Sequence, residues 1–579
     1  MIGAGERTRD RRRGLAAPVL LTLVVALSGC GVGASGAKRP RGPDRQRFDV
    51  SRARAVHPAP GQRRLGLTDP ATQIDFSVVL RLPGHVRLQR FLNGLRDPRS
   101  KSFRHYITPT QFGARFGISN ADLRALTEAL GRDGVAVIRR YPQRTALEVR
   151  APAQVVNRLF GISLTDYVDS HGHRYHAPQN TPTVPAGLRS VVSGVAGLDS
   201  EPSFRPADVP VNGLTPHEAA VAYDLAPLGA MGIQGQGQKI AVVSLDSFNP
   251  SDLAAFKSQF GLTGPAPQVI PIAGGAGGPG GMQQEVDLDL DVLTSIAPQA
   301  QILDYEAPNG GPVTWGQIVD RIVADHQADI VSDSWGICEF APRTRSEYQR
   351  DEQSIAAADA AGVSIFAASG DSGAYDCTEK GNNPTDLRLS VEYPASSAGV
   401  VAVGGTSLSV GQDGSYLKEN GWEDVLSRAG SGGGLSALFA RPSWQSAPGV
   451  QNRFSNGMRQ LPDVSAAADV ASPWPVVAQG QLGSAGGTSA AAPFWAASMV
   501  LVRQFAAQQN AGRLGFVAPM LYAIASSPQP APPFHDITAG GNLFYQATPG
   551  WDFVTGLGSP DVNNLAQDVV AYLQQHPQH

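Results

Sequence analysis

Ile240-Ala-Val-Val-Ser-Leu245 is a short, continuous run of apolar residues, and further runs of the same kind follow it along the chain. These runs are Ile302–Ala307, Ile330–Ser334, Val363–Ala368 and Val400–Val403. Helical windows such as Thr314–His326 and Ser346–Ala361 lie between them. Continuous apolar strands that alternate with helices are typical of an α/β fold, in which helices cover both faces of a parallel sheet. Reactive groups in such folds collect at the carboxyl ends of the strands.

A smaller region with a different pattern precedes these runs, from about residue 70 to residue 200. Phe76–Leu82 has the character of a strand, and Val86–Leu95 and Asn120–Gly131 have the apolar spacing of amphipathic helices. Two β-rich runs and one more helix follow, at Val135–Ile138, Thr145–Val149 and Pro152–Phe160. Strand, helix, strand, strand, helix and strand is the ferredoxin-like order. The sequence therefore predicts a small α+β domain ahead of the parallel sheet.

The stretch Glu201–Gly213 separates the two patterns. It contains three prolines and shows no apolar periodicity. We therefore predict an exposed linker, the kind of segment in which proteases cut. The predicted domain boundaries are residues 59–200 for the first domain, 201–213 for the linker and 214–579 for the second domain.

The composition excludes several classes of protein. Hydrophobic residues make up 42% and charged residues 17% of the 579, which allows a large core, and the length suits two or three domains. The net charge of −3 argues against a nucleic-acid surface, because phosphate binding needs a concentrated basic face. Three cysteines are too few for a disulfide scaffold or a four-cysteine zinc site. A polytopic membrane protein is excluded, since the one long apolar run lies at the extreme N-terminus.

Residues 1–30 have the organisation of a signal peptide. Five arginines precede the apolar run Leu15–Leu27, which is too short to span a bilayer comfortably. The run ends in Leu27-Ser-Gly-Cys30, which resembles the lipobox of bacterial lipoproteins, in which a lipid is attached to the cysteine. We therefore expect a membrane anchor at Cys30, with an ordinary secretory signal as the alternative.

Residues 31–58 are rich in glycine, alanine, proline and arginine and have almost no apolar periodicity. They are expected to form a flexible basic tether, whose charge would suit an anionic membrane surface. The pair Arg12-Arg13 leaves both general secretion and twin-arginine export open. Either route puts the mature protein outside the cytoplasm.

Gly486-Gly-Thr-Ser489-Ala-Ala-Ala-Pro493 precedes a helical window that runs to about Gln504. A serine that is reached through glycines at a helix N-terminus is expected to be exposed, at the positive end of the helix dipole. Pro493 is expected in the first turn, where proline is tolerated. A plain serine or threonine cap is the alternative interpretation. The motif does not fit the nucleophile elbow of α/β-hydrolases, which needs glycine where Ala491 stands.

Carboxylates are concentrated in Gln284-Glu285-Val-Asp287-Leu-Asp289-Leu-Asp291. In a helix, Glu285 and Asp289 lie one turn apart on the same face. Like charges at this spacing do not stabilise a helix, although acidic residues near a helix start are a common alternative explanation. Another carboxylate, Asp371, follows an apolar strand in Ser369-Gly-Asp371-Ser-Gly373, where a simple turn is the alternative.

Together these motifs resemble those of the sedolisin family of serine-carboxyl peptidases. Gly-Thr-Ser-x-x-x-Pro is similar to the signature of subtilisin-like enzymes, but no histidine after the linker stands in the His-Gly-Thr context of a subtilisin base. Other stretches that resemble the family's blocks are Leu214-Thr-Pro216, Tyr223-Asp-Leu225, Ser334-Trp-Gly336, Ser431-Gly-Gly-Gly434, Arg441–Gln445 and Leu461–Ser465. Tyr106-Ile-Thr-Pro109 resembles part of its activation prodomain.

The resemblance implies a subtilisin-like catalytic domain behind a kumamolisin-like activation prodomain. It implies that Ser489 is the nucleophile and Glu285 its general base. It further implies that Asp289 orients the base and that Asp371 donates to the oxyanion. Two carboxyls in contact do not both ionise easily, so Glu285 and Asp289 are expected to share a proton. Asp371 can donate only while it is protonated, so activity is expected in acid. Some family members have an additional glutamate where this chain has Ser244.

The resemblance also implies one structural calcium ion. The matching segments are Phe534–Thr538 and Thr548–Asp552. The implied ligands are the side chains of Asp536 and Asp552 and the backbone carbonyls of Ile537, Thr548 and Gly550. Calcium prefers such an all-oxygen set, so His535 is expected to be packed rather than to bind the ion. Two ordinary aspartate turns are the alternative.

Cys338 and Cys377 each follow a motif at the end of a strand. Outside the cytoplasm, two remaining cysteines at neighbouring strand ends are expected to pair.

The sequence thus predicts an exported, lipid-anchored, acid-active endopeptidase, made as a precursor that cleaves itself within Glu201–Gly213. The expected partners are polypeptide substrates, the prodomain as an intramolecular inhibitor, and the membrane through Cys30. We expect a monomer that binds no nucleic acid. The alternatives are a tripeptidyl-peptidase of the same family and a non-catalytic cell-surface binding protein on the same fold.

Overall fold

A computed structural model describes residues 62–169, 172–201, 214–310, 315–341, 343–378 and 387–577. The predicted signal peptide, the tether, Cys30 and nearly all of the predicted linker therefore lie outside the described residues. Within these described ranges, every helix is too short or too polar to cross a membrane.

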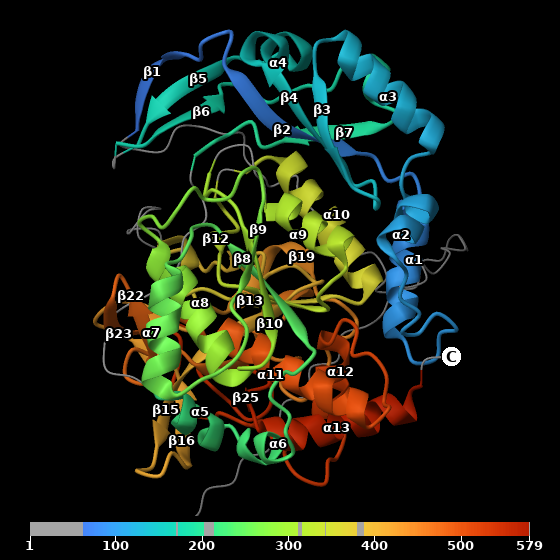
Figure 1. The fold of residues 1–579 in the computed structure, drawn as a ribbon. Coiled ribbons are helices and arrows are strands. Elements are labelled where there is room, and N and C mark those ends of the chain that lie inside the picture. The colour runs from blue at the N-terminus through green and yellow to red at the C-terminus, as the bar shows by residue number, and fades with distance from the viewer. Residues whose placement is uncertain are drawn as a thin grey trace, which may run out of the picture. The chain divides into compact units, whose positions relative to one another are not determined.

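The N-terminal region, residues 62–201, is built on antiparallel strands (Figure 1). Its main sheet has the order β3-β4-β2-β7, and its smaller sheet has the order β1-β5-β6. The strands are β1 (Arg63–Leu67), β2 (Gln73–Leu80), β3 (Ala136–Arg140), β4 (Ala146–Pro152), β5 (Leu164–Val168), β6 (Arg174–Pro178) and β7 (Val192–Ala196). The helices are α1 (His85–Arg96), α2 (Pro109–Phe116), α3 (Asn120–Arg132), α4 (Ala153–Phe160) and the short η2 (Ala186–Leu188). The four-stranded order is the predicted ferredoxin-like arrangement, with β5 and β6 inserted before its last strand.

The core of this region follows from the alternation of the strand residues. Phe76 and Val78 on β2 and Val149 on β4 are buried on one face of the sheet. The ring of Phe76 meets Phe160 of α4 edge to face, with 5.6 Å between centroids. The amphipathic α4 ends at Gly161, whose positive φ of 65° suits a helix C-cap.

The C-terminal region, residues 214–577, contains the predicted parallel sheet. Its strand order is β16-β15-β13-β11-β8-β10-β9, with β21 paired to β15, and β16 alone among the described strands of this sheet is antiparallel. The strands are β8 (Lys239–Ser244), β9 (Gln268–Pro271), β10 (Gln301–Glu306), β11 (Ile330–Asp333), β13 (Ser364–Ala368), β15 (Val401–Val410), β16 (Tyr416–Gly421) and β21 (Val464–Ala467). The central strands are mainly apolar because both of their faces are buried: Ile240, Ala241 and Val242 have no exposed surface.

Two long buried helices approach the carboxyl ends of these strands. They are α8 (Gln283–Ile296) and α11 (Thr488–Gln508), which pack against each other (Figure 1). Trp495 of α11 stacks on Phe366 of β13, so α11 lies directly on the sheet. A second helix pair, α9 (Trp315–Asp325) and α10 (Arg345–Ala361), agrees with the predicted helical windows to within one residue at every end.

Shorter elements complete the C-terminal region. The helices are α5 (Pro216–Ala222), α6 (Ala226–Ala230), α7 (Pro250–Phe260), η3 (Asp376–Thr378), α12 (Ala518–Ala525) and α13 (Val562–Gln575). The strands are β12 (Ile337–Cys338), β14 (Glu392–Tyr393), β17 (Glu423–Asp424), β18 (Ala429–Gly430), β19 (Gly434–Ala440), β20 (Met458–Leu461), β22 (Trp474–Ala478), β23 (Gln481–Ala485), β24 (Phe534–His535) and β25 (Ser559–Pro560).

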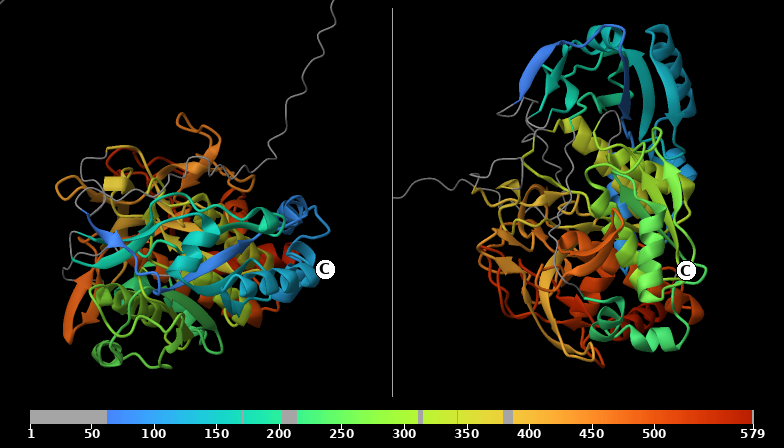
Figure 2. Two further views of the ribbon diagram at one scale, coloured as in Figure 1. Left: turned by 90° about the horizontal axis from the view of Figure 1, so that it is seen from above. Right: turned by 60° about the vertical axis from the view of Figure 1, so that its left-hand side comes forward.

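The β22–β23 hairpin lies beside α7 and α8, although about 200 residues separate them in the sequence (Figures 1 and 2). The N–H of Gly480 donates to Asp252 of α7 at 3.0 Å. The N–H of Val477 donates to Asp291 of α8 at 2.9 Å. These acidic side chains therefore hold the hairpin in place.

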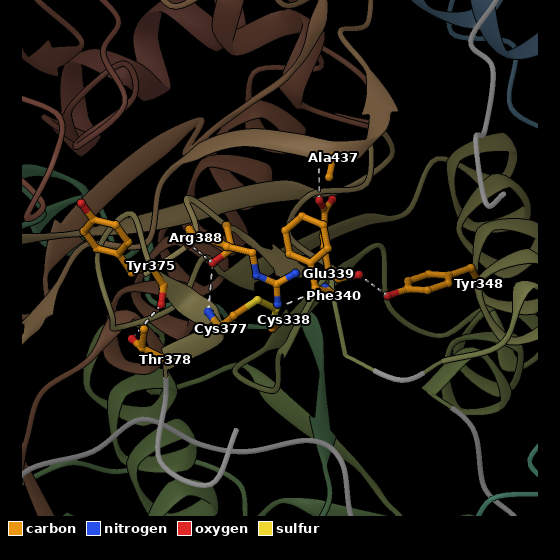
Figure 3. The surroundings of a disulfide bond; sticks show 10 residues. Cys338, Glu339, Phe340, Tyr348, Tyr375, Cys377, Thr378, Arg388 and Ala437 are labelled. Atoms are coloured by element: carbon orange, nitrogen blue, oxygen red, sulfur yellow. Dashed lines mark hydrogen bonds between the residues drawn. A yellow bond between two sulfur atoms is a disulfide. The ribbon is translucent and has the colours of Figure 1, made fainter. Parts of the chain in front are cut away.

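The predicted disulfide between Cys338 and Cys377 is present (Figure 3). The two Cα atoms are 5.2 Å apart. Next to it, the N–H of Ala437 donates to the carboxylate of Glu339 at 2.6 Å, and the hydroxyl of Tyr348 donates to the backbone carbonyl of Glu339 at 3.1 Å (Figure 3). The disulfide joins the segment after β11 to the turn after β13. Each of these two segments contains one of the motifs identified in the sequence.

A buried ion-pair cluster connects the N-terminal and C-terminal regions. Arg350 of α10 pairs with Asp320 of α9 at 2.8 Å and with Glu148 of β4 at 3.1 Å. All three side chains are almost completely buried. The hydroxyl of Thr145 donates to Asp320 at 2.6 Å, and the hydroxyl of Ser77 donates to Glu148 at 2.6 Å. Each carboxylate therefore has one partner in its own region and one in the other: Asp320 accepts from Thr145, and Glu148 pairs with Arg350.

We expect Arg350→Met to lower the free energy of unfolding of the full chain by about 3–5 kcal/mol at neutral pH, because it leaves two buried carboxylates without their cation. Urea denaturation followed by tryptophan fluorescence measures the change. Arg321→Met is the matched control: Arg321 pairs with Asp325 at 2.7 Å but is partly exposed, and its loss should cost less than about 1 kcal/mol. Equal effects of the two substitutions would contradict the prediction.

Candidate active site

The acidic side chains of α8 divide into two groups with different surroundings. Asp291 accepts the N–H of Val477, and Asp287 accepts the side-chain amide of Gln283 at 3.0 Å. Asp291 is therefore part of the packing between α8 and the hairpin, whereas Asp287 is bonded within α8. Glu285 and Asp289 lie one turn apart on another face of α8, and both have no exposed surface.

Asp289 and Ser489 both contact Ser334, which directly follows β11. The Ser334 hydroxyl lies 2.6 Å from Oδ1 of Asp289 and 3.1 Å from the backbone carbonyl oxygen of Ser489. In return, the Ser489 hydroxyl donates to the backbone carbonyl of Ser334 at 3.4 Å. One of the predicted carboxyls and the predicted nucleophile are therefore both hydrogen-bonded to a single residue at the end of a central strand.

The first turn of α11 differs from the prediction in two respects. Ser489 is the second residue of α11 and is fully buried rather than exposed. The reason is that this turn lies between α8 and the segments that follow β11 and β13, which contact it through Ser334 and Asp371. Pro493 is the sixth residue of α11, so it lies in the second turn rather than the first. Gly487 precedes the helix with a φ of 119°, a conformation that favours glycine.

Asp371 is hydrogen-bonded to Thr488, the residue immediately before Ser489. Its Oδ1 accepts both the N–H and the hydroxyl of Thr488, each at 2.8 Å. The N–H of Gly430 donates to the backbone carbonyl of Asp371 at 2.8 Å and fixes the main chain. Because Oδ1 accepts two hydrogen bonds, a proton on this carboxyl belongs on Oδ2. Asp371 can therefore present a donor beside the first turn of α11.

Two further carboxyls lie near Asp289, and neither was predicted to be a site residue. Asp304 of β10 and Asp333 of β11 are fully buried and interact electrostatically with Asp289. Burial, together with these like charges, raises the pKa of Asp289 well above its usual range. Burial also raises the pKa of Asp304 and that of Asp333, each to about 7. The available signal was a charged residue inside an otherwise apolar, doubly covered strand.

Ser244 stands at the end of β8, where some relatives were expected to have a glutamate. Ser244 is fully buried beside Asp304, and its hydroxyl partly offsets the effect of burial on the pKa of Asp304. On the other side, the indole N–H of Trp315 donates to Asp333 at 2.8 Å. A carboxyl near Asp289 is therefore supplied from the neighbouring strands rather than from β8.

The two segments predicted to bind calcium are joined by hydrogen bonds. The N–H of Gly550 donates to both carboxylate oxygens of Asp536, each at 3.1 Å, and the N–H of Thr548 donates to Asp552 at 2.9 Å. Burial raises the pKa of Asp552 to about 6. Ile537 is buried next to Asp536.

This donor set suits calcium because it contains oxygen atoms alone. In the part of the chain that the structure describes, no group of three or more histidine, cysteine, aspartate or glutamate side chains could hold a metal ion. The predicted site has two carboxylates and three carbonyls, so it would not form such a group. His535 stacks on Tyr416 with 4.0 Å between ring centroids, as a packed side chain would.

Comparison with known proteins places these features in context. Residues 60–201 match the family model described as the pro-kumamolisin activation domain, and residues 271–514 match that of the subtilase family. The chain is 31% identical over 573 residues to kumamolisin of Bacillus sp. (strain MN-32), with coverage of 92% of this chain and 98% of that protein. It is 27% identical over 569 residues to tripeptidyl-peptidase 1 of Pan troglodytes, with coverage of 89% and 96%.

A solved structure is similar as well. It is that of Pseudomonas sedolisin, a serine-carboxyl proteinase, complexed with two molecules of pseudo-iodotyrostatin. The TM-score is 0.54 at 30% identity, with coverage of 63% of this chain and 98% of that chain. The parallel α/β region is therefore subtilisin-like, as the sequence predicted.

The buried carboxyls predict that the free energy of unfolding decreases as the pH rises from about 4 to 7. The pKa values of Asp304 and Asp333 are raised to about 7 in the folded protein, whereas an unfolded aspartate titrates near 4. The folded state therefore holds protons that the unfolded state releases in this window, and each such group contributes a slope of about 1.4 kcal/mol per pH unit.

Urea denaturation of the Ser489→Ala variant at several pH values measures this slope without interference from the candidate nucleophile. Adding Asp333→Asn should make the slope shallower. Stability that increases from pH 4 to pH 7 would contradict the prediction.

Proposed function

Because the chain belongs to the sedolisin family of serine-carboxyl peptidases, we propose that it is an exported, acid-active endopeptidase that is made as a self-processing precursor. Family membership makes it a serine-type peptidase, a hydrolase, with an activation domain of the pro-kumamolisin type. The observation that carries the proposal is the arrangement around the first turn of α11, where Asp289 and Asp371 reach Ser489 through Ser334 and Thr488.

In the proposed reaction, Ser489 attacks the carbonyl carbon of the scissile peptide bond and Glu285 accepts the serine proton. Asp289, one turn away on α8, orients Glu285 and shares a proton with it. Glu285 then returns the proton to the leaving amine, and a water molecule hydrolyses the acyl-enzyme by the reverse sequence. The complete burial of Glu285 and Asp289 supports this role, because a buried carboxyl pair holds one proton between its members.

The negative oxygen of the tetrahedral intermediate needs hydrogen-bond donors. We assign them to the protonated carboxyl of Asp371 and the backbone N–H of Ser489. The two hydrogen bonds from Thr488 to Oδ1 support the assignment, because they leave Oδ2 to carry the proton. A donor of this kind is worth about 3–4 kcal/mol of transition-state stabilisation. An ionised Asp371 would instead repel the developing charge, which is the physical reason for an acid optimum.

The N-terminal region acts as the prodomain in this proposal. Its assigned extent is residues 59–200, with self-cleavage within 201–213 and a catalytic domain at 214–579. The buried ion pair of Arg350 with Glu148 supports an inhibitory contact between the two regions. Because burial raises the pKa of Glu148, the contact takes up a proton as the pH falls and is not weakened by acid, so release of the prodomain would follow cleavage of the linker. Export through residues 1–30, with a lipid on Cys30 and a tether at 31–58, completes the proposed precursor.

A tripeptidyl-peptidase is the second candidate, and the similarity to tripeptidyl-peptidase 1 over nearly its whole length favours it. Sequencing the products from an unfolded polypeptide separates the two activities. Internal cleavage products indicate an endopeptidase, whereas successive three-residue products from the N-terminus indicate a tripeptidyl-peptidase. A non-catalytic binding protein would give no products in acid, and its result would equal that of Ser489→Ala.

We also propose one structural calcium ion, bound by Asp536, Ile537, Thr548, Gly550 and Asp552. The all-oxygen character of this set and the hydrogen bonds that join its two segments support the assignment. The ion would stabilise the turns after β24 and before β25 and take no part in the reaction.

The first test is the pH profile of peptide hydrolysis by the processed protein, with an unstructured polypeptide as substrate. We expect activity in acid and its loss toward neutrality in the native enzyme, and no activity or self-cleavage in Ser489→Ala. Asp371→Asn keeps the acceptor for Thr488 and presents an amide donor that does not titrate, so its activity should persist to higher pH. Asp371→Ala should lose about 10²–10³-fold in kcat. Maximal native activity at neutral pH would exclude the proposed mechanism.

The second test is removal of calcium. Chelation should lower the Tm of the processed protein, and added Ca²⁺ should restore it, because an ion that binds only the folded state stabilises it. Asp536→Ala should lower the Tm and abolish the response to Ca²⁺. Asp568→Ala, which removes a buried aspartate on α13 outside this site, should leave the response intact. An Asp536→Ala variant that still responds fully to Ca²⁺ would exclude the site.

A further inference from the structure

The hydroxyl group of Ser334 has one hydrogen and two acceptors within reach. Oδ1 of Asp289 is 2.6 Å away and the carbonyl oxygen of Ser489 is 3.1 Å away. A hydroxyl donates one hydrogen and accepts through its lone pairs. Which neighbour receives the hydrogen therefore depends on whether Asp289 carries a proton of its own.

The carbonyl of Ser489 needs this donor because of Pro493. In an α-helix, the N–H of residue 493 would donate to the carbonyl of residue 489, four positions earlier. Proline has no N–H, so this carbonyl loses its helical partner. Ser489, Pro493 and Ser334 are all buried, so water does not readily replace the missing donor. An unsatisfied buried carbonyl would loosen the turn that carries the nucleophile.

We propose that Ser334 is a positioning residue that couples the protonation of Asp289 to the placement of Ser489. When Asp289 holds a proton, its O–H donates to the Ser334 oxygen, and the Ser334 hydrogen goes to the Ser489 carbonyl. When Asp289 is ionised, the Ser334 hydrogen turns to the carboxylate, and the Ser489 carbonyl loses its donor. The one bond that breaks is the O–H bond of Asp289, whose proton passes to the solvent; the Ser334 hydroxyl keeps its hydrogen and only turns. The inference rests on the proposed function of Ser489.

The charges around Asp289 favour its protonated form. Asp333 and Asp304 act on it from strands β11 and β10, and Glu285 lies one turn away on α8. Burial raises its pKa most, Asp333 and Asp304 raise it further, and the hydrogen bond from Ser334 lowers it by less, so the proton stays on Asp289 to a higher pH than on an exposed aspartate.

Charged groups on the other elements that pack against α8 are engaged elsewhere. These groups are Asp252 and Lys257 on α7, which act on Asp291, and His217 and Glu218 on α5, of which the first is exposed and the second caps its own helix. The first two turns of α11 contain no titratable side chain other than hydroxyls. Burial, with the carboxyls of β10 and β11 as the nearby charges, therefore controls the protonation of Asp289.

Three variants of the processed enzyme test the inference through kcat, KM and the pH profile. Ser334→Ala should lower kcat about tenfold in acid with KM within about twofold, because it removes the donor to Ser489. Ser334→Thr keeps the hydroxyl and should retain most of the activity. Ser334→Ala combined with Pro493→Ala restores an N–H at residue 493, so it should recover at least half of the loss on a logarithmic scale. Ser332→Ala, which removes a buried hydroxyl two residues earlier in β11, is the matched control.

The pH dependence separates positioning from general destabilisation. The native enzyme loses the bond to Ser489 as Asp289 ionises, so the ratio of native to Ser334→Ala kcat should shrink from acid toward neutral pH. A constant ratio, or a double variant no more active than Ser334→Ala, would overturn the inference. If Ser334→Ala does not fold, the other variants decide. A Ser334→Thr enzyme with the native pH profile and a Pro493→Ala enzyme whose activity declines less toward neutrality would together support the inference. A Pro493→Ala enzyme with the native decline would overturn it. A native enzyme without peptidase activity would instead reject the proposed function.

Discussion

The site depends on one constraint: acidic side chains are buried where α8 meets the C-terminal ends of the central strands. An ionised carboxylate is costly to bury without a cation, and Asp289 has Asp304 and Asp333 as its electrostatic neighbours instead. The compatible solution is to keep these groups protonated, and each proton then supplies a hydrogen-bond donor that a carboxylate lacks. The fold is thus most stable at the pH at which an aspartate can donate a hydrogen bond to an oxyanion. Stability and chemistry favour acid for the same physical reason.

The second constraint is the shape of the first turns of α11. Gly487 allows the chain to enter the helix from an extended approach, and Pro493 removes one helical hydrogen bond directly above Ser489. Both features free main-chain groups near the nucleophile. Asp371 binds Thr488 from the β13 side and Ser334 binds Ser489 from the β11 side, so two strand ends make contacts that the helix itself does not make.

Much of the fold could be predicted from the sequence because the central strands are buried on both faces. The run Ile240–Leu245 is β8 within one residue at each end, and Ser346–Ala361 is α10 within one residue. The β22–β23 hairpin was missed because Pro475 and Gly483 interrupt its alternation. Asp304 was missed for a different reason: local patterns identify a buried strand but do not show which helix covers it. The positions of Ser334 and Thr488 were within recognised motifs, yet their contacts depend on how three elements converge.

The proposed prodomain contact follows the same electrostatic logic as the site. Glu148 is buried against Arg350, and burial raises its pKa, just as burial raises the pKa of Asp289. A fall in pH therefore protonates both places: it neutralises Glu148, whose pKa is raised in the contact, and it protonates the carboxyls around Ser489. A histidine base would respond oppositely, because acid would charge it and remove its ability to accept a proton. A carboxyl base thus lets acid start catalysis, and with it the proposed cleavage of the linker, while the contact at Glu148 is not weakened by acid, so release of the prodomain would follow the cleavage.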